Sequence, residues 1–246
     1  MALKATPNDQ RRLLTLQEAD TLIVRLQGKL KSLPQTQRID ELDTELSVLD
    51  RAVLERLGAH DDATAGVARI ESDVQVVRAR LQRNRDRLPT ITDAKTATAT
   101  EHENETLERR QGILEDLELE AMQQQEDAAT ALAEARREAE TARAERDRLA
   151  AERELAAGDL EQQLQAARAE RGERAAEVPT DLLALYDRQR ERYGIGATLL
   201  QRRTSVASGV ELTAAELYEI RQAADEDVLL DPNSSAILVR TDESGI

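Results

Sequence analysis

Apolar residues recur at alternating steps of four and three along most of this chain, and this rhythm limits the folds that the chain can adopt. It runs without a slip from Leu42 to Leu88 and resumes from Leu107 to Leu160. A repeat that averages about 3.5 residues puts the apolar side chains on one stripe of a helix, and such a stripe needs a partner helix to cover it. The rhythm therefore predicts long helices in a coiled coil.

The predicted stripe, or seam, differs in character between the two halves. Alanine replaces most of the large residues after Ala128, so the second half could pack closely against the first. Two successive steps of four, from Gln124 through Ala128 to Leu132, predict a stutter that unwinds the supercoil locally. The polar seam residue Asn84 is expected to help fix the register. The predicted seam comprises Leu16, Ala19, Ile23, Leu26, Leu30 and Leu33; Leu42, Leu46, Leu49, Val53, Arg56, His60, Ala63, Val67, Ile70, Val74, Val77, Leu81, Asn84 and Leu88; Leu107, Arg110, Leu114, Leu117, Ala121 and Gln124; and Ala128, Leu132, Ala135, Ala139, Ala142, Arg146, Leu149, Arg153, Ala156 and Leu160.

The residue inventory also favours long helices over a globular core. The 246 residues include no Phe and no Trp, and 34% of them are charged, a composition typical of coiled coils. A net charge of −15 disfavours long-range attraction to a polyanion. No apolar run approaches the ~20 residues of a membrane span, and the first ten residues lack the apolar core of a signal peptide. We therefore expect a cytoplasmic protein with no membrane contact.

A threonine-rich stretch that opens on Pro89 separates two arms of nearly equal length, residues 8–88 and 101–178. Equal arms about one breaker predict an antiparallel hairpin over residues 1–178, with residues 89–104 as its tip. Asn8 or Asp9 is expected to cap the first helix. Pro34 predicts a break within residues 32–37. Between Gly58 and Gly66, a continuous helix and an interruption remain equally open, because glycine's helix penalty of about 1 kcal/mol opposes seam burial.

Residues 179–246 have a different composition and predict a small α+β module. Helices are expected at residues 181–193 and 213–224, the second beginning at a capping box formed by Thr213 and Glu216. Short strands are expected at residues 228–230 and 236–239, on either side of a turn. The predicted fold class is therefore mainly α, a long antiparallel coiled-coil hairpin with a small C-terminal module.

Several motifs together carry a resemblance to a known family. The hairpin motifs are residues 9–14 (DQRRLL), 77–80 (VRAR), 108–111 (ERRQ) and 114–116 (LED). The C-terminal motifs are Leu183, Leu185 and Tyr186, then residues 194–197 (GIGA), 210–212 (VEL) and 237–240 (ILVR). Over essentially its whole length the chain resembles bacterial proteins that join a coiled-coil hairpin to a C-terminal zinc ribbon with four cysteines, proteins predicted to bind nucleic acid.

In that family the ribbon carries two Cys-x-x-Cys pairs. The resemblance places the four ligand positions on Ser205, Ser208, Asp231 and Ser234, and the chain contains no cysteine. Hydroxyls are poor zinc ligands, so the resemblance implies a zinc-ribbon-like module without zinc, and no cofactor is expected. A hard cation at Asp231 is the weaker alternative, and a turn held by local hydrogen bonds is the favoured interpretation.

The resemblance implies an adaptor or scaffold with protein partners, including roles linked to flagellar or type III secretion machinery and to alternative sigma factors. The chain lacks a phosphate-binding loop, a nucleophile elbow and a metalloprotease motif, and we expect no enzyme activity. A spacer or homodimer is a weaker option, and either a monomer or a homodimer is expected. The recognition surface is expected at the tip or, by a narrow preference, in the C-terminal module.

The alternative function is RNA or DNA binding through a locally basic segment of the module. Arginines interleaved with an aromatic ring can grip phosphate and stack on a base. The arginines at positions 78–87 face glutamates across the predicted tip, at Glu101, Glu103, Glu105 and Glu108, so pairing between the arms is expected there. The candidate contact residues of the module are Arg188, Arg190, Arg192, Tyr193, Arg202 and Arg203.

Overall fold

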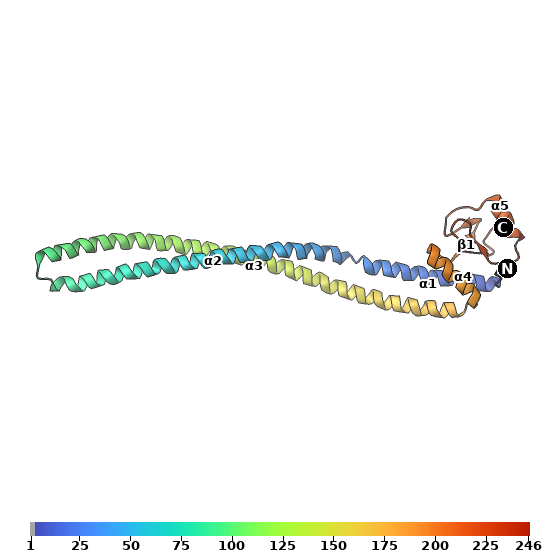
Figure 1. Cartoon of the computed structure of the whole chain (residues 1–246), viewed down its shortest axis with the longest axis horizontal. Coiled ribbons are helices and arrows are strands. Elements are labelled where there is room, and N and C mark those ends of the chain that lie inside the picture. The colour runs from blue at the N-terminus through green and yellow to red at the C-terminus, as the bar shows by residue number, and fades with distance from the viewer. Residues whose placement is uncertain (1–2) are drawn as a thin grey trace. The chain divides into compact units, whose positions relative to one another are not determined.

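The computed structural model describes residues 3–246 and is mostly helical, with one small sheet (Figure 1). The predicted class, a long helical hairpin with a small C-terminal module, is confirmed. None of the helices in the described part of the chain is both long and apolar enough to cross a membrane. The elements are α1 (Pro7–Lys31), α2 (Pro34–Arg87), the 3-10 turn η1 (Leu88–Thr90), α3 (Ala94–Ala176), α4 (Thr180–Tyr193), β1 (Ala197–Gln201), β2 (Thr204–Ser205), α5 (Ala214–Gln222), β3 (Leu229–Leu230) and β4 (Ile237–Val239).

The chain forms two compact units. One, here called the sheet unit, comprises Met1–Pro34 and Glu152–Ile246, and the other, the hairpin unit, comprises Gln35–Ala151. The sheet unit thus combines α1 and the last part of α3 with all of the C-terminal elements. A domain boundary at residues 178/179 stays a prediction.

In the hairpin unit, α2 follows the predicted seam closely. Every predicted seam residue from Leu42 to Leu88 is buried or half-buried except Arg56, which is exposed. The helix continues without interruption through residues 58–66. Of the two alternatives for this segment, a continuous helix is therefore the correct one. A Cβ added at Gly58 or Gly66 would meet no atom within 4 Å, so packing does not require glycine at either position. Burial of Val67 and Val74 offsets the helix penalty of the two glycines, about 1 kcal/mol each.

In the first part of the second arm the predicted seam is confirmed at Leu107, Leu114 and Ala121 and wrong at the three positions between and after them. Gln111, Glu118 and Gln125 lie half-buried on the inward face of α3, whereas the predicted Arg110, Leu117 and Gln124 are exposed. The inward positions keep steps of four and three from Leu107 to Ala142, so the stutter is absent. The physical reason is that α2 offers an unbroken seam, and side chains interlock only where the two helices share one period.

The tip is shorter than predicted. Helix α3 begins at Ala94, so residues 94–104 are helical and only a few residues separate the arms. Asp93 stabilises this start, because its carboxylate accepts hydrogen bonds from the backbone N–H and the hydroxyl of Thr96 at 3.0 and 2.5 Å, as a helix cap does. Those bonds also lower the pKa of Asp93, the hydroxyl bond most strongly.

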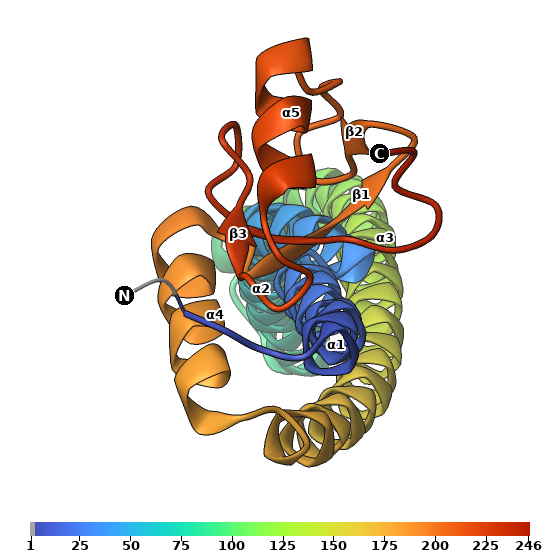
Figure 2. The ribbon, with the colours of Figure 1, turned by 90° about the vertical axis from the view of Figure 1, so that its right-hand side faces the viewer.

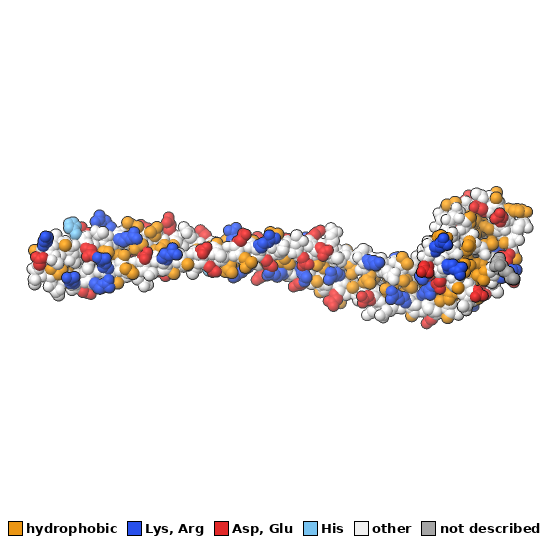
Figure 3. Space-filling model, in the orientation of Figure 1, with side chains coloured by type: hydrophobic (Ala, Val, Ile, Leu, Met, Phe, Trp, Pro, Cys, Tyr) orange, Lys and Arg blue, Asp and Glu red, His pale blue; other side chains and the backbone are white. Residues whose placement is uncertain are grey.

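Charges pair across the two arms near the tip, as predicted. Arg80 pairs with Glu103, and Arg85 lies 2.8 Å from Glu108. Asn84, the predicted polar seam residue, is half-buried on α2, and Asn104 is half-buried on α3. Basic and acidic side chains are interspersed along the arms (Figure 3), so charge pairing is a sufficient role for the arginine-rich stretch.

In the sheet unit, both ends of α1 are determined by residues close to them in sequence. Thr6, not Asn8 or Asp9, is the N-cap, with Pro7 as the first helical residue, and the Thr6 side chain accepts from the N–H of Asp9 at 3.2 Å. Proline suits this position because its missing N–H would have no helical partner. The helix ends at Lys31, one residue before the predicted break, and it contacts α3 through a core of Ile23, Leu26, Leu164 and Ala167.

The sheet has the strand order β2-β1-β4-β3. Strands β3 and β4 confirm the predicted pair in shorter form, but β1 and β2 were not predicted. β1 runs parallel to β4, with Ala197 opposite Ile237. Leu3 and Ala5 add backbone hydrogen bonds to Val228 and Glu226 at 3.1 and 2.8 Å, so the N-terminal segment extends the module.

Alternate residues of the central strands β1 and β4 pack into two different hydrophobic cores. Ile237 and Val239 pack with α1 and α4, whereas Leu238 packs on α5 together with Leu200. Figure 2 shows α1 and α5 on opposite sides of the strands. Helix α5 begins with the predicted capping box between Thr213 and Glu216, which is confirmed, and α4 begins at Thr180, one residue earlier than predicted.

Candidate interaction site

Tyr186 on α4 joins α1 to β1. Its ring lies against Gly196 so closely that a Cβ at position 196 would be 2.4 Å from Cε2 of the tyrosine. The hydroxyl of Tyr186 lies 2.8 Å from Oδ2 of Asp20 and 3.2 Å from Oε1 of Gln17. The same Gln17 oxygen accepts from the N–H groups of Gly196 and Ala197 at 2.8 and 3.3 Å. One tyrosine and one glutamine thus fix the start of β1 on α1.

Asp20 is a buried carboxylate whose side chain is 3% exposed, and it is the centre of an ion-pair network. Its Oδ1 accepts from Arg171 Nε at 3.2 Å and from Arg190 Nη1 at 2.8 Å. Arg171 also donates to Asp187 at 2.6 Å. Two arginines and two aspartates therefore balance one another, as a buried charge requires.

The network changes the ionisation of two of its members. Burial, together with the hydrogen bond to Asp20, raises the pKa of Tyr186 far above its ordinary value, so the phenol stays protonated. Burial alone would lower the pKa of Arg171, but the charges of Asp20 and Asp187 and the hydrogen bonds to them raise it overall. Both shifts favour the protonation states that hold the elements together.

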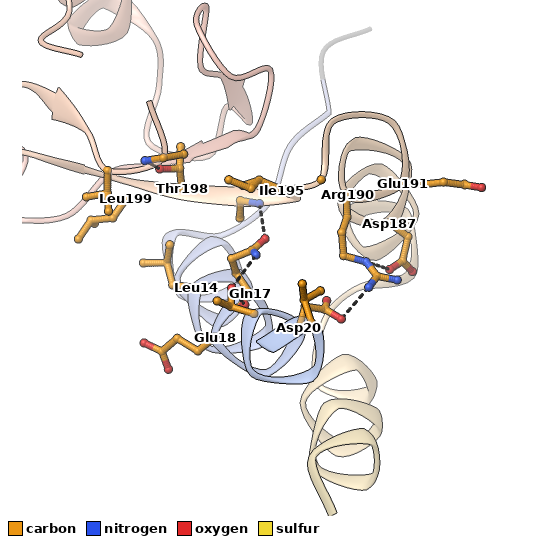
Figure 4. A pocket seen from close by; sticks show the side chains of 16 residues that line it. Leu14, Gln17, Glu18, Asp20, Asp187, Arg190, Glu191, Ile195, Thr198 and Leu199 are labelled. Carbon is orange, nitrogen blue, oxygen red and sulfur yellow. Dashed lines mark hydrogen bonds and ion pairs between the residues drawn. The ribbon is translucent and has the colours of Figure 1, made fainter. Parts of the chain in front are cut away.

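A groove opens beside this network, between α1, α4 and the β1–β2 edge, with a volume of about 900 Å³. Its apolar lining is only partly covered, because Val24 is 63% exposed and Val206 is 57% exposed. Glu18 and Glu191 extend outward from α1 and α4 on opposite sides of it (Figure 4). The apolar lining residues are Leu14, Val24, Ile195, Ala197, Leu199, Val206 and Ala207.

The predicted basic contact residues do not come together at one place. Arg190 is engaged with Asp20, while Arg188, Arg192 and Tyr193 are exposed on α4. Arg192 lies 5.3 Å from the centre of the Tyr193 ring. Arg202 and Arg203 are exposed in the turn at the other end of β1, and this five-residue strand spans about 16 Å. Both turn residues have positive φ, of 49° and 69°.

Three of the four positions that the resemblance assigns to zinc ligands do come together, around Asp231. Its Oδ2 accepts from the hydroxyls of Ser205 and Ser234 at 2.8 and 2.5 Å, and from the N–H of Ser234 at 3.1 Å. Ser208 instead accepts from the N–H of Val210 at 3.3 Å. Asp231 is 1% exposed and Ser205 is fully buried.

This cluster does not fit zinc. The carboxylate oxygen that would bind a metal already accepts three hydrogen bonds, and a structural zinc site needs thiolate or imidazole donors. Residues 3–246 contain no group of three or more His, Cys, Asp or Glu side chains placed to hold a metal ion. The hydrogen bonds around Asp231 hold the two turns together without a metal.

Sequence reasoning missed Gln17, Asp20 and Arg171. A signal for Asp20 was present, because Leu13, Leu16, Asp20 and Ile23 follow the steps of three and four of an apolar stripe. A carboxylate on such a stripe must be neutralised when it is buried. The identity of its partners could not be read locally, since Arg171 and Arg190 are 151 and 170 residues away.

The likeness to known proteins extends over nearly the whole chain. Residues 16–194 match a family model described as the CT398-like coiled coil hairpin domain. The uncharacterized protein Rv2229c of Mycobacterium tuberculosis H37Rv is 33% identical over 242 residues, which are 97% of this chain and 98% of that protein. A solved structure from Mycobacterium smegmatis has a TM-score of 0.82 at 34% identity, covering 97% of this chain and 100% of the other. CT398 from Chlamydia trachomatis has a TM-score of 0.61 at 13% identity, covering 95% and 98%, and so shares the fold.

Proposed function

Because the chain belongs to the family of CT398-like coiled coil hairpin domains, we propose that it is a non-enzymatic adaptor that binds protein partners through its sheet unit. The groove between α1, α4 and β1 carries this proposal. Val24 and Val206 are more than half exposed at its edges, and partly covered apolar surface in a groove is a usual place for a protein partner. The proposal includes the predicted cytoplasmic location, which cell fractionation with an antibody checks.

The hydrogen bonds and ion pairs that hold the walls of the groove in place support an adaptor role. The Asp20 network ties α1, α3 and α4 together, and Gln17 ties α1 to β1. A preformed surface loses little conformational freedom when a partner binds. The groove is therefore suited to recognition without rearrangement.

Truncating the module is a poor test of this function, because Leu13 and Leu16 of α1 pack against α4 and β4 in one core, which truncation would expose. Point variants avoid this difficulty. Val206→Lys places a charge in the groove, and Leu119→Lys is a control at an apolar side chain that is 67% exposed on α3 of the hairpin unit.

The test immobilises the intact chain in lysate of its own source organism, identifies captured proteins by mass spectrometry and repeats binding with the purified partner. We expect the wild-type chain and Leu119→Lys to bind the partner and Val206→Lys to lose it. If only Leu119→Lys loses the partner, the binding site lies in the hairpin unit, and the adaptor function is still supported. If no captured protein binds again in purified form, the adaptor function is wrong.

Nucleic-acid binding is the second candidate, supported by the exposed pair of Arg192 and Tyr193. Phosphate contacts are strongest at low salt, so binding of labelled single-stranded RNA and DNA is measured there by anisotropy. Salt-sensitive binding that Arg188→Glu with Arg192→Glu abolishes would support this function. Absence of binding at low salt would eliminate it.

A further inference from the structure

We propose that the groove of the sheet unit accepts a basic amphipathic helix of a partner protein, with apolar side chains on the groove floor and Lys or Arg on its flanks, beside Glu18 and Glu191. This inference rests on the proposed adaptor function and names the chemistry of the partner. The shape of the α1 wall, the charge of the rim and the size of the groove carry it.

One wall of the groove is a row of side chains along one face of α1. Leu14, Gln17, Thr21 and Val24 line the groove and repeat at steps of three, four and three, so they lie on one face of the helix. The wall is about 15 Å long at ~1.5 Å per residue. Val24, at its end, is 63% exposed. Side chains in such rows fit between those of a second helix laid alongside.

The rim of the groove is acidic. Among the lining residues, Glu18, Asp20, Asp187 and Glu191 are carboxylates and only Arg190 is basic. Arg171 and Arg190 balance Asp20 and Asp187, which leaves Glu18 and Glu191. Glu18 is 75% exposed, and its nearest cation, Arg174, is 3.9 Å away and bound to Glu170 at 2.6 Å. A partner with cationic flanks therefore complements the rim.

The dimensions favour a helix over a small molecule. A volume of about 900 Å³ lies near the upper end for ligand pockets, which enclose most of their ligand. This groove is instead partly open to solvent, with Val24 and Val206 more than half exposed at its edges. A helix can cover both edges at once and still leave its polar face in water.

The test uses a labelled helical peptide with leucine on one face and lysine on its flanks, and fluorescence anisotropy with the intact protein. A matched peptide carries glutamate in place of lysine. Val24→Lys blocks the wall, and Val48→Lys is the control, since Val48 is a similarly exposed valine (58%) on α2 of the hairpin unit. Both variants change the net charge by the same amount, so a difference in affinity between them does not come from general attraction of the peptide to an acidic protein. Binding is measured at physiological salt, where the Debye length is about 8 Å and long-range attraction is screened.

We expect the leucine–lysine peptide to bind at least about tenfold more tightly than the leucine–glutamate peptide, and Val24→Lys to weaken it by about tenfold. Val48→Lys is expected to bind like the wild type, and circular dichroism checks that both variants are folded. If the leucine–lysine peptide binds Val24→Lys and Val48→Lys with equal affinity, the groove is not its binding site. If the two peptides bind the wild type with equal affinity, the partner need not be basic.

Two further outcomes would also contradict the inference. If sedimentation shows a wild-type dimer that Val24→Lys dissociates, the groove is an interface between copies of this chain. A captured partner that binds Val24→Lys normally would refute the groove as its site while the adaptor function stands.

Discussion

Ser205 donates a 2.8 Å hydrogen bond to Oδ2 of Asp231, 26 residues further along the chain, and both side chains are buried. The bond links the end of β2 to the turn between β3 and β4. Ser234 donates to the same oxygen, so one carboxylate joins the segments that the ribbon-like resemblance assigns to a metal.

Replacing Asp231 with Ala is expected to lower the free energy of unfolding of the module by about 2–4 kcal/mol, because it leaves buried hydroxyl and N–H donors without an acceptor. Tyrosine fluorescence in urea measures this, since all three tyrosines lie between residues 186 and 218. Asp242→Ala is the control, because Asp242 is fully exposed. Equal effects of the two substitutions would show that the cluster contributes nothing specific.

Four cysteines at positions 205, 208, 231 and 234 are expected to create a zinc site. The backbone already brings the two turns together, and thiolates bind zinc at ~2.3 Å. Elemental analysis after gel filtration should find one zinc per chain in the S205C/S208C/D231C/S234C variant and none in the wild type. A folded variant without zinc, or stoichiometric zinc in the wild type, would contradict the ribbon-like interpretation.

Tyr186 makes the sheet unit sensitive to alkali. Its raised pKa in the fold means that the neutral phenol contributes stability that is fully present below the pKa of an unfolded tyrosine, about 10, and is lost as pH rises through the folded value. Tyrosinate absorbance should therefore show one group that ionises only at strongly alkaline pH or on unfolding. Tyr186→Phe should abolish that step, and its persistence would show that another tyrosine is responsible.

Gly196 has no room for a side chain. Gly196→Ala is expected to cost about 1–3 kcal/mol of stability, because its Cβ would overlap the buried Tyr186 ring and displace it. Gly158→Ala is the matched control in a helix with open space at that position, where alanine should add roughly 0.5–1 kcal/mol. Urea unfolding followed by tyrosine fluorescence compares them. A neutral Gly196→Ala would mean that Tyr186 can move at little cost.

Local patterns sufficed for much of the fold. The seam of α2, the break before Pro34 and the capping box at Thr213 all follow from residues within one or two helical turns, where propensity and periodicity act. The seam of the second arm was misplaced at Gln111 and Glu118, because apolarity alone marked Leu117 as inward. The facing helix set the register instead, and polar residues with long apolar stems occupy the seam.

The sequence by itself determined that this chain forms a helical hairpin with a small α+β module, because two equal arms that carry a repeat of four and three can cover their apolar stripes by folding back on each other. Only the tertiary structure decided which polar residues matter. Asp20 finds Arg171 and Arg190, Asp231 finds Ser205, and the groove of α1 and β1 exists only when those elements meet. Such contacts join residues far apart in sequence, and they form because a buried polar group without a partner would cost free energy in the folded state.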